Sequence, residues 1–151
     1  MAISTAYCTQ AEADTYFAGR LNADAWDDAS SSDKDKALLN ATRLIDRLNF
    51  RGKKNNDSQE LQFPRNEDTV VPDDIKSACS EIALALLDGV DPELEWDNLR
   101  MVSQGYANVR STYDANIPNE HISNGIPSVT AWRYLKPYLR DTQSVDMSRV
   151  N

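Results

Sequence analysis

The stretch of residues 71–89, VPDDIKSACSEIALALLDG, places the strongest constraint on how this chain can fold. Its apolar residues recur at helical spacing, and its C-terminal half is apolar on nearly every side. Pro72 suits a first helical turn, and Gly89 suits a left-handed stop. An isolated helix of this length is only marginally stable in water, so other segments have to cover it. The expected inward residues are Ile75, Cys79, Ile82 and Leu86, and the expected polar side holds Lys76, Ser80 and Glu81.

Three further stretches carry the apolar periodicity that is needed to cover this helix. Thr9 and Glu12 form a capping-box pattern, which begins a short helix. Residues 33–49 give the clearest amphipathic pattern, with Ser32 as the expected N-cap. A last helix opens at Pro127. Its expected inward residues are Val129, Trp132, Leu135 and Leu139.

Other stretches leave the helical pattern. Residues 59–65, QELQFPR, place Leu61 and Phe63 on one side of an extended segment. Residues 99–113 favour one or two strands, with a ragged continuation of the helix as the alternative. The remaining connections are an acidic stretch at residues 91–97 and a loop at residues 114–125.

These patterns predict a mainly α-helical protein, with a small four-helix core and extended or β segments between the third and fourth helices. We expect one domain over residues 1–139 and a C-terminal tail, residues 140–151, that is extended or docked on a partner. Extended segments can pair with the edges of a neighbouring subunit, so we expect them to contact neighbouring subunits. Arg65 would bond an acid of the neighbour. The candidate interface residues are Phe63, Arg65, Tyr106, Val109 and Tyr113, with packing in the core as the alternative.

The amino-acid composition limits the classes of molecule that this protein can bind. Aspartate and glutamate total 24 against 16 lysines and arginines, which gives a net charge of −8. Such a field repels nucleic acid and anionic membranes unless basic residues cluster locally. The sequence has no apolar run long enough for a membrane helix and no secretory signal pattern, so we expect a soluble intracellular protein. A reducing cytoplasm disfavours a disulfide between Cys8 and Cys79.

No group of residues with catalytic spacing is evident. His121 is the only histidine, and one histidine cannot form a histidine-based zinc site. The acids do not follow the spacing of a calcium loop, and no glycine-rich run could cradle a cofactor. We therefore expect neither an enzyme nor a bound cofactor or metal.

One basic cluster could serve a nucleic-acid function. Arg51, Lys53 and Lys54 lie in a polar loop, and the adjacent Phe50 could stack on a base. The alternative is a solvated loop, because single-strand binders follow the backbone with a longer positive groove than three residues supply.

Several pieces in order resemble the head–tail connector, or adaptor, proteins of tailed bacteriophages. The most recognisable piece is Leu61-Gln62-Phe63-Pro64-Arg65. Sequences of this kind also carry the label of a DnaT-like single-stranded-DNA-binding protein. The other pieces are residues 11–17 (AEADTYF), Trp26, the helix of residues 36–48, Arg51-Gly52, Val71-Pro72 and the closing Leu135-Lys136-Pro137-Tyr138-Leu139.

The resemblance implies a structural virion protein of a bacteriophage, placed at the head–tail junction after synthesis in the host cytoplasm. Such proteins form a homo-oligomeric, commonly dodecameric ring that binds beneath the portal protein. The ring extends the DNA channel and takes part in viral tail assembly by docking tail or nozzle proteins. DNA passes through the lumen without sequence-specific binding, and no membrane is involved.

Two other functions stay open. The first is a single-stranded-DNA-binding accessory protein of the primosomal DnaT-like kind, which the basic loop of residues 50–54 favours. The second is an enzyme or regulator of unknown chemistry, which would require a pocket with perturbed titrating groups.

Overall fold

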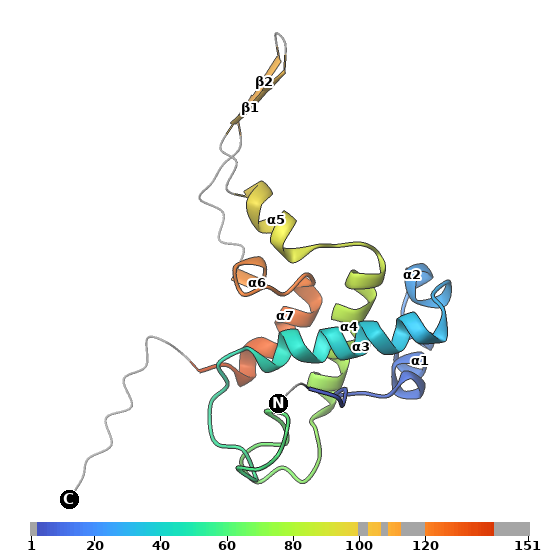
Figure 1. Ribbon diagram of the computed structural model, residues 1–151, viewed down its shortest axis with the longest axis vertical. Coiled ribbons are helices and arrows are strands. Elements are labelled where there is room, and N and C mark those ends of the chain that lie inside the picture. The colour runs from blue at the N-terminus through green and yellow to red at the C-terminus, as the bar shows by residue number, and fades with distance from the viewer. Residues whose placement is uncertain (1–2, 100–102, 107–108, 113–119, 141–151) are drawn as a thin grey trace, which may run out of the picture.

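A computed structural model describes residues 3–99, 103–106, 109–112 and 120–140 of the chain. The helix α4 (Asp73–Leu87) runs through the middle, and α3 (Ser31–Asp46) crosses it (Figure 1). The mainly helical class predicted from the sequence is confirmed. The other elements are α1 (Gln10–Ala18), α2 (Asp24–Asp27), α5 (Pro92–Leu99), β1 (Ser103–Tyr106), β2 (Val109–Thr112), α6 (Glu120–Ser123), α7 (Val129–Leu135) and the 3-10 turn η1 (Lys136–Tyr138).

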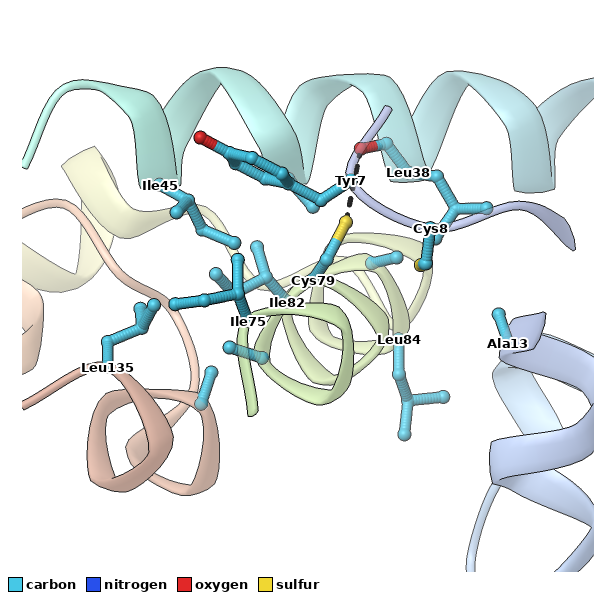
Figure 2. Packing of buried hydrophobic residues seen from close by; sticks show 14 of the residues in the cluster. Tyr7, Cys8, Ala13, Leu38, Ile45, Ile75, Cys79, Ile82, Leu84 and Leu135 are labelled. Atoms are coloured by element: carbon cyan, nitrogen blue, oxygen red, sulfur yellow. Dashed lines mark hydrogen bonds between the residues drawn. The ribbon is translucent and has the colours of Figure 1, made fainter. Parts of the chain in front are cut away.

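The α4 helix is covered from several sides, as its apolar sequence requires. Figure 2 views the core along the axis of α4: α3 runs across the top, α7 lies at the lower left and α1 lies at the right. Burial of a large apolar side chain contributes about 1.5–3 kcal/mol, so these contacts dominate the stability of the fold. The predicted inward residues Ile75, Cys79 and Ile82 are fully buried, whereas Leu86 is only partly buried.

The helix boundaries follow local capping chemistry. The capping box is confirmed: the Glu12 amide donates to Thr9 Oγ1 at 3.3 Å, and the Thr9 amide donates to Glu12 Oε2 at 2.8 Å. The expected start of α3 is wrong by two residues, because Ser30 rather than Ser32 accepts from the Asp33 amide, at 3.2 Å. The same helix ends at Asp46, three residues before the predicted end. Gly89 has a φ of 85° just after α4, as expected for a left-handed stop.

The expected polar side of α4 is wrong for two residues. Ser80 and Glu81 are both buried, and Glu81 is only 2% exposed. Its carboxylate is paired with the Arg20 guanidinium, with Nε–Oε1 at 2.5 Å and Nη2–Oε2 at 3.0 Å, and it accepts from the Tyr16 hydroxyl at 2.8 Å. Tyr16 lies in the last turn of α1 and Arg20 lies two residues after it, so this ion pair links the end of α1 to α4, with Glu81 buried and the Arg20 side chain 30% exposed.

The region after Gly89 differs from the prediction in three places. Residues 91–97 are not a plain connection, because Pro92–Leu99 forms α5, with Glu93 and Glu95 in its first turn. The predicted loop of residues 114–125 contains α6, and residues 113–119 lie outside the described residues. Val129 is 49% exposed instead of facing inward, because it occupies the first position of α7.

Two short antiparallel strands follow α5. Ser103 pairs with Thr112, and Tyr106 pairs with Val109, so β1 and β2 form a two-stranded ladder. Both strands lie within the stretch whose composition favoured extended structure. Predicted contacts of these strands with neighbouring subunits stay a prediction, and Tyr113 lies outside the described residues.

The ion pair between Arg20 and Glu81 leads to a prediction about the stability of the protein. Replacing Glu81 with Gln leaves the Arg20 guanidinium without its charge partner, and breaking such a pair costs about 3 kcal/mol. The matched control is Glu120→Gln, which removes an exposed pair with Lys136 and is expected to cost less than about 1 kcal/mol. Urea unfolding followed by circular dichroism measures both. Equal losses in the two variants would contradict the assignment of Glu81 to the core.

Candidate nucleic-acid interface

The connection between α3 and α4 folds onto the body of the protein instead of extending from it. Phe63 is buried in a cluster of aromatic rings, with ring centroids 4.7 Å from Phe50, 5.7 Å from Tyr138 and 6.0 Å from Tyr7. The peptide bond from Phe63 to Pro64 is cis. Phe50 is 4% exposed, so the expectation that its ring stacks on a base is wrong. Its hydrophobic surface completes the core, which removes it from solvent.

Arg65 holds the α3–α4 connection together through hydrogen bonds from its buried guanidinium. Its guanidinium donates to the carbonyl oxygens of Phe50, Arg51 and Gly52 at 3.4, 3.0 and 2.7 Å, and to two oxygens of Gln62 at 3.3 and 2.7 Å. Only 6% of the residue is exposed. An arginine can serve several carbonyls at once because its five N–H groups form a planar fork.

Phe63 and Arg65 were expected to contact a neighbouring subunit, whereas within this chain they hold the α3–α4 connection in place. Both residues are buried, and the Arg65 guanidinium is used by its own loop and not by a neighbour's acid. Their contact with another subunit stays a prediction. The structure places Tyr106 and Val109 on the β1–β2 hairpin, apart from this loop (Figure 1).

A tight turn sets the direction of the basic side chains. Gly52 has a φ of 77°, and a Cβ at that position would lie 1.9 Å from Asn66 Oδ1. Asn66 Oδ1 accepts from the Lys53 amide at 3.2 Å, and the Asn66 amide donates to the Lys53 carbonyl at 2.8 Å. With its backbone paired in this way, Lys53 carries its side chain on the exposed surface.

The C-terminal segment adds another cation to the same place. Residues 49–51 pair antiparallel with residues 138–140: the Arg51 amide donates to the Tyr138 carbonyl at 3.0 Å, and the Arg140 amide donates to the Asn49 carbonyl at 2.9 Å. This pairing lays Arg140 beside the end of α3, although it is far from Arg51 in sequence. We define the basic edge as Arg47, Arg51, Lys53, Lys54 and Arg140.

Most of the basic edge is open to solvent. Lys54 is half-buried and donates to the Gln59 carbonyl at 3.4 Å, and the other four residues are exposed. No acid occurs between Arg47 and Asn56, while Asp57, Glu67 and Asp68 lie further along the same connection. Arg47 is the residue at the C-terminal end of α3, where the helix dipole favours positive charge.

Tyr138 supplies an aromatic group at this edge. Its hydroxyl donates to Asp74 Oδ2 at 3.1 Å, and the residue is half-buried. Burial, the hydrogen bond with Asp74 and the negative charges of Asp74 and Asp68 raise the pKa of Tyr138, and the positive charge of Arg51 opposes them. Tyr138 and Arg51 are neighbours through their backbones, because the Arg51 amide donates to the Tyr138 carbonyl.

Within the part of the chain that the structure describes, no group of three histidine, cysteine or carboxylate side chains is placed to hold a metal ion. His121 is half-buried, and burial lowers its pKa. No described helix is both long and apolar enough to cross a bilayer.

Comparison with known proteins identifies the family. Residues 2–150 match the model of a family described as "Putative DnaT-like ssDNA binding protein". The chain belongs to this family. No curated protein matches it. No solved structure matches it either.

This match corrects the expectation of a bacteriophage virion component. The matched family is described by single-stranded-DNA binding, and not as a head–tail connector, a portal-binding adaptor or a part of tail assembly. The description of this protein as a structural ring in a virion is therefore wrong on this finding. The label DnaT-like, which the resemblance also carried, is confirmed at the level of the family.

Sequence patterns identified only part of the basic edge. Arg51, Lys53 and Lys54 were evident because they are neighbours in a polar loop. Arg140 was missed because its place depends on backbone pairing between distant segments. Arg47 falls within the predicted helix of residues 33–49, and its position about one turn before the basic loop was the available signal.

Arg65 provides a test of how the loop is held. Replacing Arg65 with Ala leaves several buried carbonyl oxygens without donors, so we expect a loss of about 2–4 kcal/mol in the free energy of unfolding. Arg51→Ala is the matched control, since it removes an exposed arginine from the same loop and is expected to change stability by less than about 0.5 kcal/mol. Urea unfolding and limited proteolysis within residues 50–66 measure the effect. A fully stable Arg65→Ala variant would refute this role.

Proposed function

We propose that this protein is a non-catalytic accessory protein that binds single-stranded DNA through the basic edge. The observation that carries the proposal is that Arg47, Arg51, Lys53 and Lys54 follow one another at and after the end of α3, with Arg140 paired by its backbone to Asn49 between them, in an otherwise acidic chain. Membership of a family described by single-stranded-DNA binding supports it. Cations clustered in this way attract phosphates locally even when the net charge of the protein is negative.

The geometry favours contact with the DNA backbone over base-specific contact. The exposed cations lie on a loop and at a helix end, and cationic side chains of this kind bind phosphate oxygens, which carry no sequence information. The half-buried Tyr138, whose carbonyl accepts from the Arg51 amide, supplies one aromatic ring in this region. We therefore expect weak binding without sequence preference, with a Kd of roughly 10⁻⁴–10⁻⁶ M.

The distribution of charge also favours one end of α3 as the place where the strand binds. The acidic α2 lies toward the start of α3, whereas the basic edge lies at its other end (Figure 1). Repulsion from Asp24, Asp27 and Asp28 would keep the strand away from α2 and favour the opposite end of α3.

A charge-matched pair of triple variants tests the proposal. The first variant, Arg47→Ala with Arg51→Ala and Lys53→Ala, removes three exposed cations from the basic edge. The second, Lys36→Ala with Arg133→Ala and Lys136→Ala, removes three exposed cations elsewhere. Fluorescence anisotropy of a labelled oligothymidylate of about 20 nucleotides gives Kd as a function of salt.

The first variant is expected to bind at least about tenfold more weakly at low salt, because each lost phosphate contact removes released counterions. Its slope of log K against log salt is expected to fall by about 2, at roughly 0.7 for each phosphate of a single strand. The second variant should keep most of the affinity. Undetectable binding by the unmodified protein at low salt, or equal losses in both variants, would refute the proposal.

A further inference from the structure

A pocket beside α1 exposes one side of a cysteine that is otherwise buried. The pocket has a volume of about 310 Å³ and lies between α1 and the first half of α4. Cys8 is 3% exposed and lies on its wall, together with Glu12, Lys76 and Ser80. A small molecule in this pocket would therefore meet the Cys8 thiol, although most of the residue is enclosed by protein.

A second cysteine lies behind the first. Cys79 is fully buried on α4, and its Sγ is 3.5 Å from Thr42 Oγ1 and 3.5 Å from the Leu38 carbonyl oxygen (Figure 2). The same Thr42 hydroxyl accepts from the Tyr7 amide at 2.9 Å. This shared hydroxyl places the backbone just before Cys8 next to Cys79.

Ser80 links the two cysteines from the other direction. Its Oγ lies 3.6 Å from Cys8 Sγ, and it follows Cys79 directly in the sequence. The two thiols thus occupy one network at the junction of the N-terminal segment, α3 and α4. Both are free cysteines in the structure.

The two thiols have unequal acidity. A hydrogen bond from Cys79, together with the Ser80 hydroxyl and the positive charge of Lys76, lowers the pKa of Cys8 against the effects of burial and of Glu12. The hydrogen bond with Cys8 and burial both raise the pKa of Cys79. Thiolates and not thiols are the nucleophiles, so Cys8 is the reactive member of the pair.

We propose that Cys8 and Cys79 form an oxidisable pair, in which a small hydroperoxide enters the pocket, oxidises Cys8 and leads to a disulfide within the chain. The Cys8 thiolate attacks one peroxide oxygen, so an S–O bond forms, the O–O bond breaks and hydroxide leaves. Cys79 then attacks the sulfenic sulfur: an S–S bond forms, the S–O bond breaks, and the oxygen leaves as water with the thiol proton. Two electrons pass from the two sulfurs to the peroxide.

The test treats the full-length protein with hydrogen peroxide and follows the intact mass. The expected product is a monomer that has lost two hydrogens, and protease digestion should yield one linked peptide pair that contains Cys8 and Cys79. Loss of both thiols through links between different molecules, or no linked pair within one chain, would overturn the proposal.

Substitutions separate the two roles. In Cys79→Ser the sulfenic acid has no thiol to meet, so dimedone should label Cys8. In Cys8→Ser the remaining Cys79 should not react under the same conditions. Equal labelling of Cys79 in that variant would overturn the assignment of Cys8 as the attacking thiol.

A surface variant tests the environment without altering either cysteine. Lys76→Gln removes the cation on the pocket wall and is expected to slow oxidation about threefold at neutral pH, because a modest loss of thiolate lowers the rate. Lys36→Gln is the matched control, since this exposed lysine lies on α3 away from the pocket. Unchanged rates in both variants would show that Lys76 does not assist Cys8.

Discussion

Burial of most of α4 is the constraint from which the rest of the structure follows. A helix that carries Ile75, Cys79 and Ile82 on one side and further apolar residues around its C-terminal half cannot leave any large face in water. The helices α3 and α7 cover most of α4, and α1 and the N-terminal segment pack against further parts of it. Where a charge enters this core, at Glu81, it is neutralised by Arg20 from the end of α1.

The basic edge depends on the same packing. Phe63 holds the α3–α4 connection against the aromatic core, and Arg65 fixes the carbonyl groups of residues 50–52 from inside. Arg51 and Lys53, whose backbones lie within or next to the part held by Arg65, carry their side chains on the surface. A buried arginine thus supports a loop that presents exposed cations on an otherwise acidic protein.

Helix ends that depend on neighbouring residues were predictable from the sequence. The burial of individual side chains was not predictable where it depends on contacts between distant segments. The capping box at Thr9 and the stop at Gly89 were evident because both depend on neighbours in the chain. Glu81 was placed with the polar residues because helical spacing cannot show that Arg20 will reach it. Arg65 was expected to face a partner for a similar reason: a charged residue after a proline resembles surface until its carbonyl partners are known. Part of the basic edge was predictable from adjacency, whereas Arg140 needed the pairing with Asn49.

That pairing has a practical consequence for anyone who labels or immobilises the protein. The N-terminal segment reaches the same connection, since the Ser4 amide donates to Glu60 Oε1 at 2.6 Å and the Tyr7 ring contacts Phe63. Arg140 leaves the described part of the chain at the other side of that connection. A label attached at Ser4 or at Arg140 would therefore lie beside this connection, and an acidic label there would compete with phosphates for the cations. Fluorophores for titration are better attached on α5, whose Glu95 is exposed and lies on a different part of the molecule.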